Sequence, residues 1–146
     1  MTAKAPLPQG CTNFKTRQLA RLLARQYDAE MAKAGLKGTQ YSLLSHVLHA
    51  GAVAPGELAR LMGLDASTLT RNLQPLLAAG WLVQEAGGDA RSRLVRITDA
   101  GCAKRAEAKQ HWLAAQQALN ARLGEERVVA LHQLLDDCTE LLRGEA

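Results

Sequence analysis

The chain has 146 residues, enough for one domain of ordinary size, and 47% of them are hydrophobic. Only 3% are aromatic, and Ala and Leu dominate, so the composition favours helices packed on helices over a β-sandwich. No apolar run reaches the roughly 18 residues of a membrane-spanning helix. Three widely spaced cysteines without a CxxC pair are not typical of a disulfide framework or a zinc site. We expect a cytoplasmic globular protein without a membrane segment.

The net charge of +4 is distributed unevenly along the chain. Residues 124–146 contain six acidic and two basic residues, so this segment carries −4 and residues 1–123 carry +8. A polyanion would therefore be attracted to the first part of the chain and repelled by its end. Charge alone does not identify a nucleic-acid-binding protein, because many basic proteins bind no nucleic acid.

The first part of the chain predicts a flexible arm followed by helices. Residues 1–12 contain Pro6, Pro8 and Gly10 but no continuous apolar block, and we expect a flexible N-terminal arm there. Helical spacing of apolar residues, bounded by caps and glycines, predicts helices at Asn13–Ala34, at Thr39–His49 with Thr39 as cap, at Pro55–Met62, and from the cap Asp65 to about Ala79. Pro75 lies inside the last of these helices, where we expect a kink or a late break.

The apolar period then changes from 3.6 to 2, which indicates β-structure. Trp81–Glu85 and Leu94–Thr98 alternate as strands, and Gly87, Gly88 and Asp89 between them are a turn signal. A β-hairpin therefore follows directly after the predicted helices.

Two long helices are predicted at the end of the chain. Thr98 can cap Asp99–Leu123, and Gly124 separates this helix from Glu125–Leu142. A coiled-coil-like seam with spacings of three and four residues runs along the last helix, through Val128, Leu131, Leu135, Cys138 and Leu142. Such a face exceeds what one small domain covers, so a homodimer is expected.

These elements predict an all-α fold with a small β-hairpin wing. We expect residues 35–98 to form a winged helix-turn-helix DNA-binding domain, and residues 13–34 and 99–146 to supply the N- and C-terminal dimerisation helices. The chain is nevertheless expected to form a single compact unit.

The helix after Asp65 is the predicted DNA-recognition helix, and double-stranded DNA is the expected partner. The major groove of B-DNA, about 12 Å wide, admits an α-helix, whose first turns then reach the base edges. Polar side chains able to contact bases or phosphates lie on this helix at Ser67, Thr68, Thr70, Arg71 and Gln74.

The hairpin tip is the second predicted DNA contact. Arg91 and Arg93 on a short loop suit a narrow, electronegative minor groove. Asp89 is expected to pair with a nearby arginine, Arg93 or Arg96, and so to brace the wing without touching DNA.

With these motifs the chain resembles the MarR family of bacterial transcriptional regulators over about residues 13–142. The matching residues are Gly35-Leu36, Gln40, Glu57-Leu58-Ala59, Leu64-Asp65-Ala66-Ser67-Thr68-Leu69-Thr70-Arg71, Leu76, Gly80, Asp89-Ala90-Arg91 and Ile97-Thr98-Asp99-Ala100-Gly101. The resemblance implies a two-fold dimer held by the terminal helices and bound to a pseudo-palindromic operator, usually as a repressor. It also implies release by a small phenolic or lipophilic effector, by cysteine oxidation or by a metal.

Several alternatives remain open at the level of the sequence. Tyr41, His46, His111 and Trp112 could line a pocket for an aromatic or lipophilic effector, or simply pack in the core. His46, His49 and His111 could approach a metal, but partly buried histidines are commoner, and we expect no metal and no cofactor. Cys11 could respond to oxidation at the start of its helix beside Lys15, whereas Cys102 and Cys138 occupy apolar helical positions.

Two other function classes are weighed against a DNA-binding regulator. An enzyme is disfavoured because the chain has no GxSxG, HExxH or phosphate-loop motif. A winged-helix module that binds protein is the remaining alternative, but this chain keeps arginines on the predicted wing.

Overall fold

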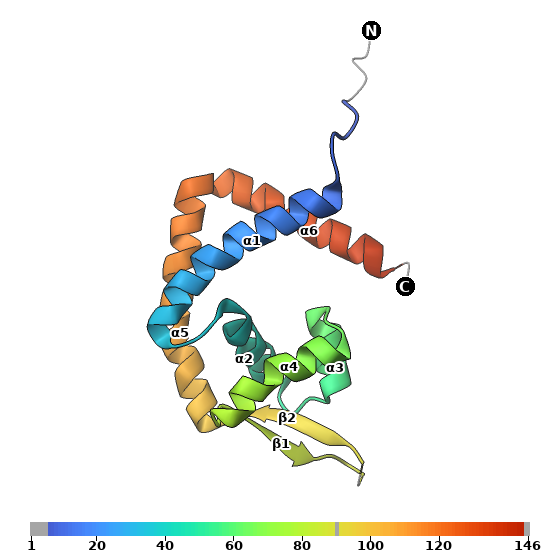
Figure 1. Cartoon of the computed structure of the whole chain (residues 1–146), viewed down its shortest axis with the longest axis vertical. Helices are drawn as coiled ribbons and strands as arrows, with labels where there is room; N and C mark the ends of the chain where they lie inside the picture. Colours follow the sequence, from blue (N-terminus) through green and yellow to red (C-terminus); the bar gives the residue numbers. More distant parts are fainter. Residues whose placement is uncertain (1–5, 90, 145–146) are drawn as a thin grey trace.

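The computed structural model describes residues 6–89 and 91–144 (Figure 1). Residues 1–5 of the predicted N-terminal arm, Ala90 of the wing pattern and the last two residues of the chain lie outside the described residues. The structure is mostly helical with one antiparallel β-hairpin, as the sequence predicts. The long helix α5 (Asp99–Leu123) runs from the hairpin end of the molecule to the opposite end, where it meets α6 (Glu125–Arg143) (Figure 1).

The first helix and its connection follow the predicted bounds closely. Helix α1 (Thr12–Met31) continues into a 3-10 turn, η1 (Ala32–Ala34), which ends at Gly35 with a positive φ of 71°. Helix α2 (Gly38–Ala50) begins after Lys37, so the prediction of Thr39 as its cap is wrong. Side chains supply the cap instead: Gln40 Oε1 accepts the Lys37 N–H at 2.8 Å, and Asp28 of α1 accepts the Gly38 N–H at 2.7 Å.

Helices α3 (Pro55–Met62) and α4 (Ala66–Ala78) form the helix-turn-helix. Pro55 occupies the first turn of α3, where its missing N–H costs nothing, and Gly63 ends that helix in the left-handed conformation. Helix α4 continues through Pro75 and ends three residues later, at Ala78.

Each strand of the hairpin is shifted by one residue from its predicted bounds. Strand β1 (Leu82–Ala86) pairs antiparallel with β2 (Arg93–Ile97), with Leu82 opposite Ile97 and Ala86 opposite Arg93. Val53, in the α2–α3 connection, forms a further bridge to Val95, with N···O distances of 3.0 and 2.8 Å. The sequence analysis missed this bridge, which ties the wing to the start of the helix-turn-helix.

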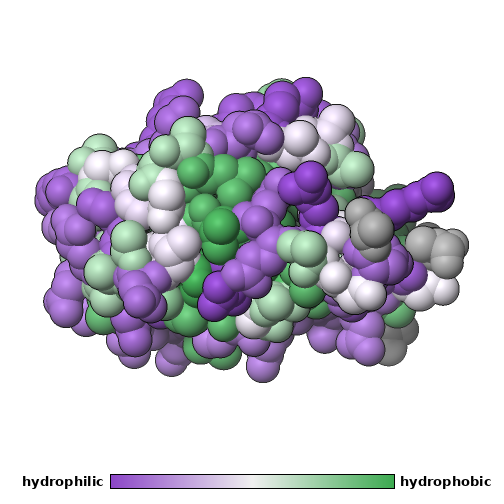
Figure 2. Space-filling view, turned by 90° about the horizontal axis from the view of Figure 1, so that it is seen from below, coloured by the Kyte–Doolittle hydropathy of each residue, from purple (hydrophilic) through white to green (hydrophobic). Residues whose placement is uncertain are grey.

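The core lies where α2 meets α1, α3, α4, α5 and the hairpin. Its fully buried large side chains are Met31, Leu43, Leu44, Val47, Leu58, Leu69, Leu76, Leu82 and Val95. On the face viewed from below in Figure 1, hydrophilic side chains surround a hydrophobic area near the centre (Figure 2). Within the described residues, no helix has the length and apolar character needed to cross a membrane.

Helix α6 contributes little to this core. Val128 is its buried residue, whereas Leu134, Leu135, Leu141 and Leu142 are 46–72% exposed. Cys138, expected at an apolar packing position, is also exposed in the single chain, and Cys102 is half-buried. The later part of the seam predicted along α6, at Leu135, Cys138 and Leu142, is therefore exposed within the described residues.

Gly101 brings the start of α5 into close contact with the hairpin. The Thr98 side chain caps α5 by accepting the Gly101 N–H at 3.0 Å, and it donates to the Gly80 carbonyl at 2.7 Å. A Cβ at position 101 would collide with the Trp81 carbonyl oxygen and lie 2.7 Å from Ile97 Cγ1. This contact explains in physical terms why the Thr98-x-x-Gly101 pattern needs a glycine at its end.

We predict that Gly101→Ala lowers the free energy of unfolding by about 2 kcal/mol or more, because backbone must move to admit the methyl group. Gly56→Ala is the matched control: its Cβ would meet nothing within 4 Å, and its effect should stay within about 1 kcal/mol. Urea denaturation of the two variants measures the difference. Equal stabilities would refute the close α5–hairpin contact.

Candidate nucleic-acid interface

The start of α4 is organised by the carboxylate of Asp65. Its Oδ1 accepts the Thr68 N–H at 2.7 Å and the Ser67 hydroxyl at 2.8 Å, and its Oδ2 accepts the Thr68 hydroxyl at 3.0 Å. These hydrogen bonds, led by the one from the Thr68 backbone, lower the pKa of Asp65 from 3.8 to about 2. Asp65 is therefore a cap that holds Ser67 and Thr68 in place.

The opposite sides of α4 differ in exposure. Leu69, Leu73 and Leu76 are buried against the core, whereas Ser67, Thr70, Arg71 and Gln74 are exposed, and Thr68 is half-buried. The Thr70 hydroxyl donates to the Ala66 carbonyl at 2.9 Å, and Arg71 Nη2 donates to Thr68 Oγ1 at 3.3 Å. The structure thus brings the five predicted recognition-helix residues together on the side of α4 that faces away from the core.

Asp89 organises the tip of the wing, although not through the predicted arginine pair. Its Oδ1 accepts the backbone N–H groups of Arg91 at 2.9 Å and of Ser92 at 2.8 Å, and these bonds lower the pKa of the carboxyl. The prediction that Asp89 pairs with an arginine side chain is wrong. An aspartate side chain is short and commonly accepts hydrogen bonds from backbone N–H groups two or three residues further along its own turn, as it does here.

The arginines of the hairpin have two different environments. Arg96 forms an ion pair with Glu85 across the two strands, which raises the pKa of Arg96. Arg91 and Arg93 are exposed, and neither forms an ion pair in the part of the chain that the structure describes. The two arginines predicted to reach DNA are therefore the ones whose charge is available to an external anion.

A second candidate site is a cavity of about 660 Å³ bounded by α1, α2 and α5. Tyr41 and Trp112, both predicted to line an effector pocket, line it, with their rings stacked at a centroid distance of 6.3 Å. Arg105 and Lys109 also line it, although the sequence analysis did not name them. The sequence could have indicated these two residues, because Arg105, Lys109 and Trp112 share one face of α5 at spacings of four and three residues.

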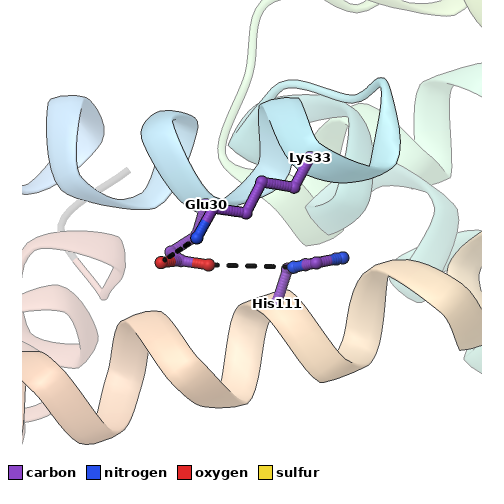
Figure 3. A network of polar contacts seen from close by, with 3 residues as sticks. All are labelled: Glu30, Lys33 and His111. Carbon is purple, nitrogen blue, oxygen red and sulfur yellow. Dashed lines mark hydrogen bonds and ion pairs between the residues drawn. The ribbon is translucent and has the colours of Figure 1, made fainter.

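The two histidines predicted for the same pocket lie elsewhere. His46 lines a smaller hollow with His49, and its Nδ1 lies 2.7 Å from the Ser42 carbonyl oxygen. His111 lies 3.7 Å from Glu30 of α1, which also pairs with Lys33 at 2.9 Å (Figure 3). Neither histidine lines the larger cavity, and the described residues contain no cluster of three metal-binding side chains.

Cys11 lies at the residue before α1 and is exposed. Its carbonyl oxygen accepts the Lys15 N–H at 3.1 Å as part of the first helical turn. Exposure is necessary for an oxidation-sensitive thiol but also common for inert ones, so a redox role for Cys11 stays a prediction.

Comparisons with known proteins agree with this geometry. The model of the MarR family matches residues 34–92. The HTH-type regulator YwoH of Bacillus subtilis is 28% identical over 117 residues, which are 80% of this chain and 85% of YwoH. The Mycobacterium tuberculosis regulator MOSR, solved in complex with DNA, is 30% identical, with a TM-score of 0.72 over 88% of this chain and 98% of MOSR. A mutant Escherichia coli MarR with operator DNA superposes with a TM-score of 0.79 at 23% identity, over 86% and 91% of the two chains.

The helix-turn-helix, the wing and the polar side of α4 define a winged-helix DNA-binding protein. The chain belongs to the MarR family of transcriptional regulators. Members of this family act on transcription by binding DNA, so the protein is a regulator and not an enzyme.

The Asp65 cap predicts a specific acid dependence of stability. Its pKa is about 2 in the folded chain and near 3.8 when unfolded, so its stabilisation is complete above pH 3.8 and lost as the pH falls to about 2. The difference in unfolding free energy between wild type and Asp65→Ala should therefore shrink across that window in chemical denaturation. Asp65→Asn, a neutral cap, should differ from Asp65→Ala by an amount independent of pH. A constant wild-type advantage down to pH 2 would contradict the ionised cap.

Proposed function

We propose that the protein is a sequence-specific cytoplasmic repressor that binds a pseudo-palindromic operator as a homodimer and is released by a small-molecule effector. The observation that carries DNA recognition is the exposed polar side of α4 beside a wing whose Arg91 and Arg93 have no ion-pair partner in the described chain. A solved MarR that shares the fold is named a multiple antibiotic resistance repressor.

The recognition helix and the wing would contact different grooves of the DNA. Helix α4 enters the major groove, where Arg71 can pair with guanine or a phosphate and Gln74 can pair with adenine. Ser67, Thr68 and Thr70 contact bases or phosphates near the helix start. Arg91 and Arg93 enter the flanking minor groove, whose negative potential attracts guanidinium groups.

A second copy of the chain is the proposed partner of the terminal helices, with residues 13–34 and 99–146 at the interface and residues 35–98 as the reading head. Leu134, Leu135, Leu141 and Leu142 of α6 are exposed together, and α1 adds Phe14 and Leu22 at 60% and 50% exposure. An apolar stripe along a helix of this length is typical of an obligate helical interface. Operator half-sites would lie about one helical turn apart.

The cavity between α1, α2 and α5 is the proposed effector site. It lies between the helices proposed for dimerisation and α2, which packs directly on α4 in the core. A ligand there can change the separation of the two reading heads, because a small rotation of α5 against α2 moves each head as a unit.

We predict a specific complex between the purified protein and DNA upstream of its own gene, seen by gel shift with excess random competitor, or with operators obtained by genome-wide selection. Arg91→Ala should weaken this complex and reduce the slope of log K against log salt by about one. Arg122→Ala, an exposed arginine at the far end of α5, is the control and should change neither value. If the protein bound no genomic DNA in preference to random DNA, a winged-helix module that binds protein would become the favoured function.

The dimer prediction is tested on α6. Leu134→Glu with Leu141→Glu places two charges in the exposed stripe, and the doubly substituted protein should be monomeric in sedimentation equilibrium and bind the operator more weakly. Its fold should persist, since these side chains are 63% and 72% exposed in the single chain. Gln133→Glu adds a charge to the same helix outside the stripe and should leave the dimer intact. A dimer that survives the double substitution would place the interface elsewhere.

A further inference from the structure

Three segments of the chain meet at the ammonium group of Lys104, near the start of α5. Its Nζ donates to the Ala34 carbonyl oxygen at 3.1 Å and lies 5.5 Å from the centre of the Trp81 ring. It also pairs with Glu107, one turn further along α5, at 3.0 Å. The Lys104 side chain is 23% exposed, so solvent and salt screen these contacts only in part.

The contact with Ala34 ties α5 to the end of the first helical segment. Ala34 is buried and is the last residue of η1, which continues α1. The carbonyl groups at the end of a helix have no following turn to supply a donor, and here the next two N–H groups bond back into the turn. A lysine ammonium at this position supplies a donor and also suits the negative end of the helix dipole.

The contact with Trp81 ties the same ammonium group to the recognition helix and the wing. Trp81 connects α4 to β1: its N–H donates to the Leu76 carbonyl of α4 at 3.0 Å, and its carbonyl accepts the Thr98 N–H at 3.0 Å. Its ring is half-buried against the core. A cation within about 6 Å of an indole centre is attracted by the ring electrons, so Lys104 is held against the point where helix and wing join.

We propose that Lys104 is a positioning residue for DNA binding, which fixes the α4–wing unit relative to α1 and α5 and so sets how strictly the protein requires one spacing of operator half-sites. This inference rests on the proposed function, since it needs two reading heads carried by one dimer. Heads held at a fixed separation accept half-sites at the matching separation only. Heads that move tolerate other spacings, but they bind the matching one less well because they must be ordered on binding.

Other polar contacts between these parts each join two segments. Thr98 joins the start of α5 to the base of the hairpin, and Asp28 joins α1 to the start of α2. Lys104 differs because one charged group contacts the end of the α1 segment and the α4–β1 junction at once. Loss of this group therefore loosens both ends of the connection between the proposed dimerisation helices and the reading head.

Two variants serve as controls for Lys104→Met, which keeps the apolar stem and removes the charge. Lys104→Arg retains a cation that can donate to the carbonyl and stack on the indole, so it should behave like wild type. Lys33→Met removes the same charge one residue from Ala34. Because Lys33 pairs with Glu30 of α1 at 2.9 Å and is 59% exposed, its loss should leave the reading head unaffected.

The first test is hydrogen exchange followed by mass spectrometry on the protein without DNA. In Lys104→Met the backbone amides of residues 34–38 and 79–83 should exchange about threefold or more faster than in wild type, because local opening of both segments becomes easier. Amides of residues 43–47, in the core of α2, report global unfolding and should change less. Lys33→Met should leave residues 79–83 unchanged. Equal exchange of residues 79–83 in Lys104→Met and wild type would overturn the proposal.

The second test compares the operator with a version lengthened by one central base pair, which moves the half-sites about 3.4 Å apart and rotates them by about 35°. Wild type should bind the lengthened operator about tenfold or more weakly than the original, and Lys104→Met should lower this ratio by about threefold or more. Lys104→Arg and Lys33→Met should keep the wild-type ratio. Loss of a charge weakens binding to both operators alike, so the ratio isolates the effect of positioning.

The outcomes separate this proposal from the function on which it rests. An unchanged ratio in Lys104→Met, or a wild type that binds both operators equally, would overturn the role of Lys104 in spacing. If wild type formed no operator complex at all, the proposed function would fail, whereas the exchange measurement, which needs no DNA, would still decide whether Lys104 holds the α4–β1 junction.

Discussion

The burial of α2 is the constraint on which the rest of the structure depends. Leu43, Leu44 and Val47 have almost no exposed surface, and α1, α3, α4, α5 and the hairpin all pack around the helix that carries them. An element surrounded in this way cannot move without repacking its neighbours, because a protein interior is as dense as an organic crystal. The position of α4 is therefore set by its packing on the core, on the side opposite its exposed polar residues.

Local electrostatics then decide which polar groups remain available to a partner. Asp65 and Asp89 are both satisfied by backbone N–H groups at the start of α4 and at the wing tip, so each acid shapes its segment. Glu85 neutralises Arg96 within the hairpin. Pairing of this kind leaves Arg91 and Arg93 as the cationic groups of the wing, and an arginine already engaged by a carboxylate would contribute little to a phosphate contact.

The same central helix links the two candidate sites. One face of α2 supplies Tyr41 and Ser45 to the cavity shared with α1 and α5, while Val47 lies in the core shared with α4. Because the cavity and α4 lie on opposite sides of one buried helix, the coupling proposed between them needs no long chain of intermediate residues. Asp28 of α1 accepts a hydrogen bond from the first residue of α2, and Arg105 of α5 donates one to Ser45 of α2. Both α1 and α5 therefore contact α2 through polar groups.

The sequence by itself determined the order and nature of the elements, the Asp65 and Thr98 caps, and the exposed residues of α4. Caps, glycine stops and apolar periods act within a few residues, which is why α3 and α5 begin and end where they were predicted. Only the tertiary structure decided the Val53–Val95 bridge, the placement of His46 and His111 outside the cavity, and the presence of Arg105 within it. Arg105 and Ser45 are 60 positions apart, and no local rule brings such residues together. Packing of the helices around α2 does so, because the shape of the whole core sets which side chains meet.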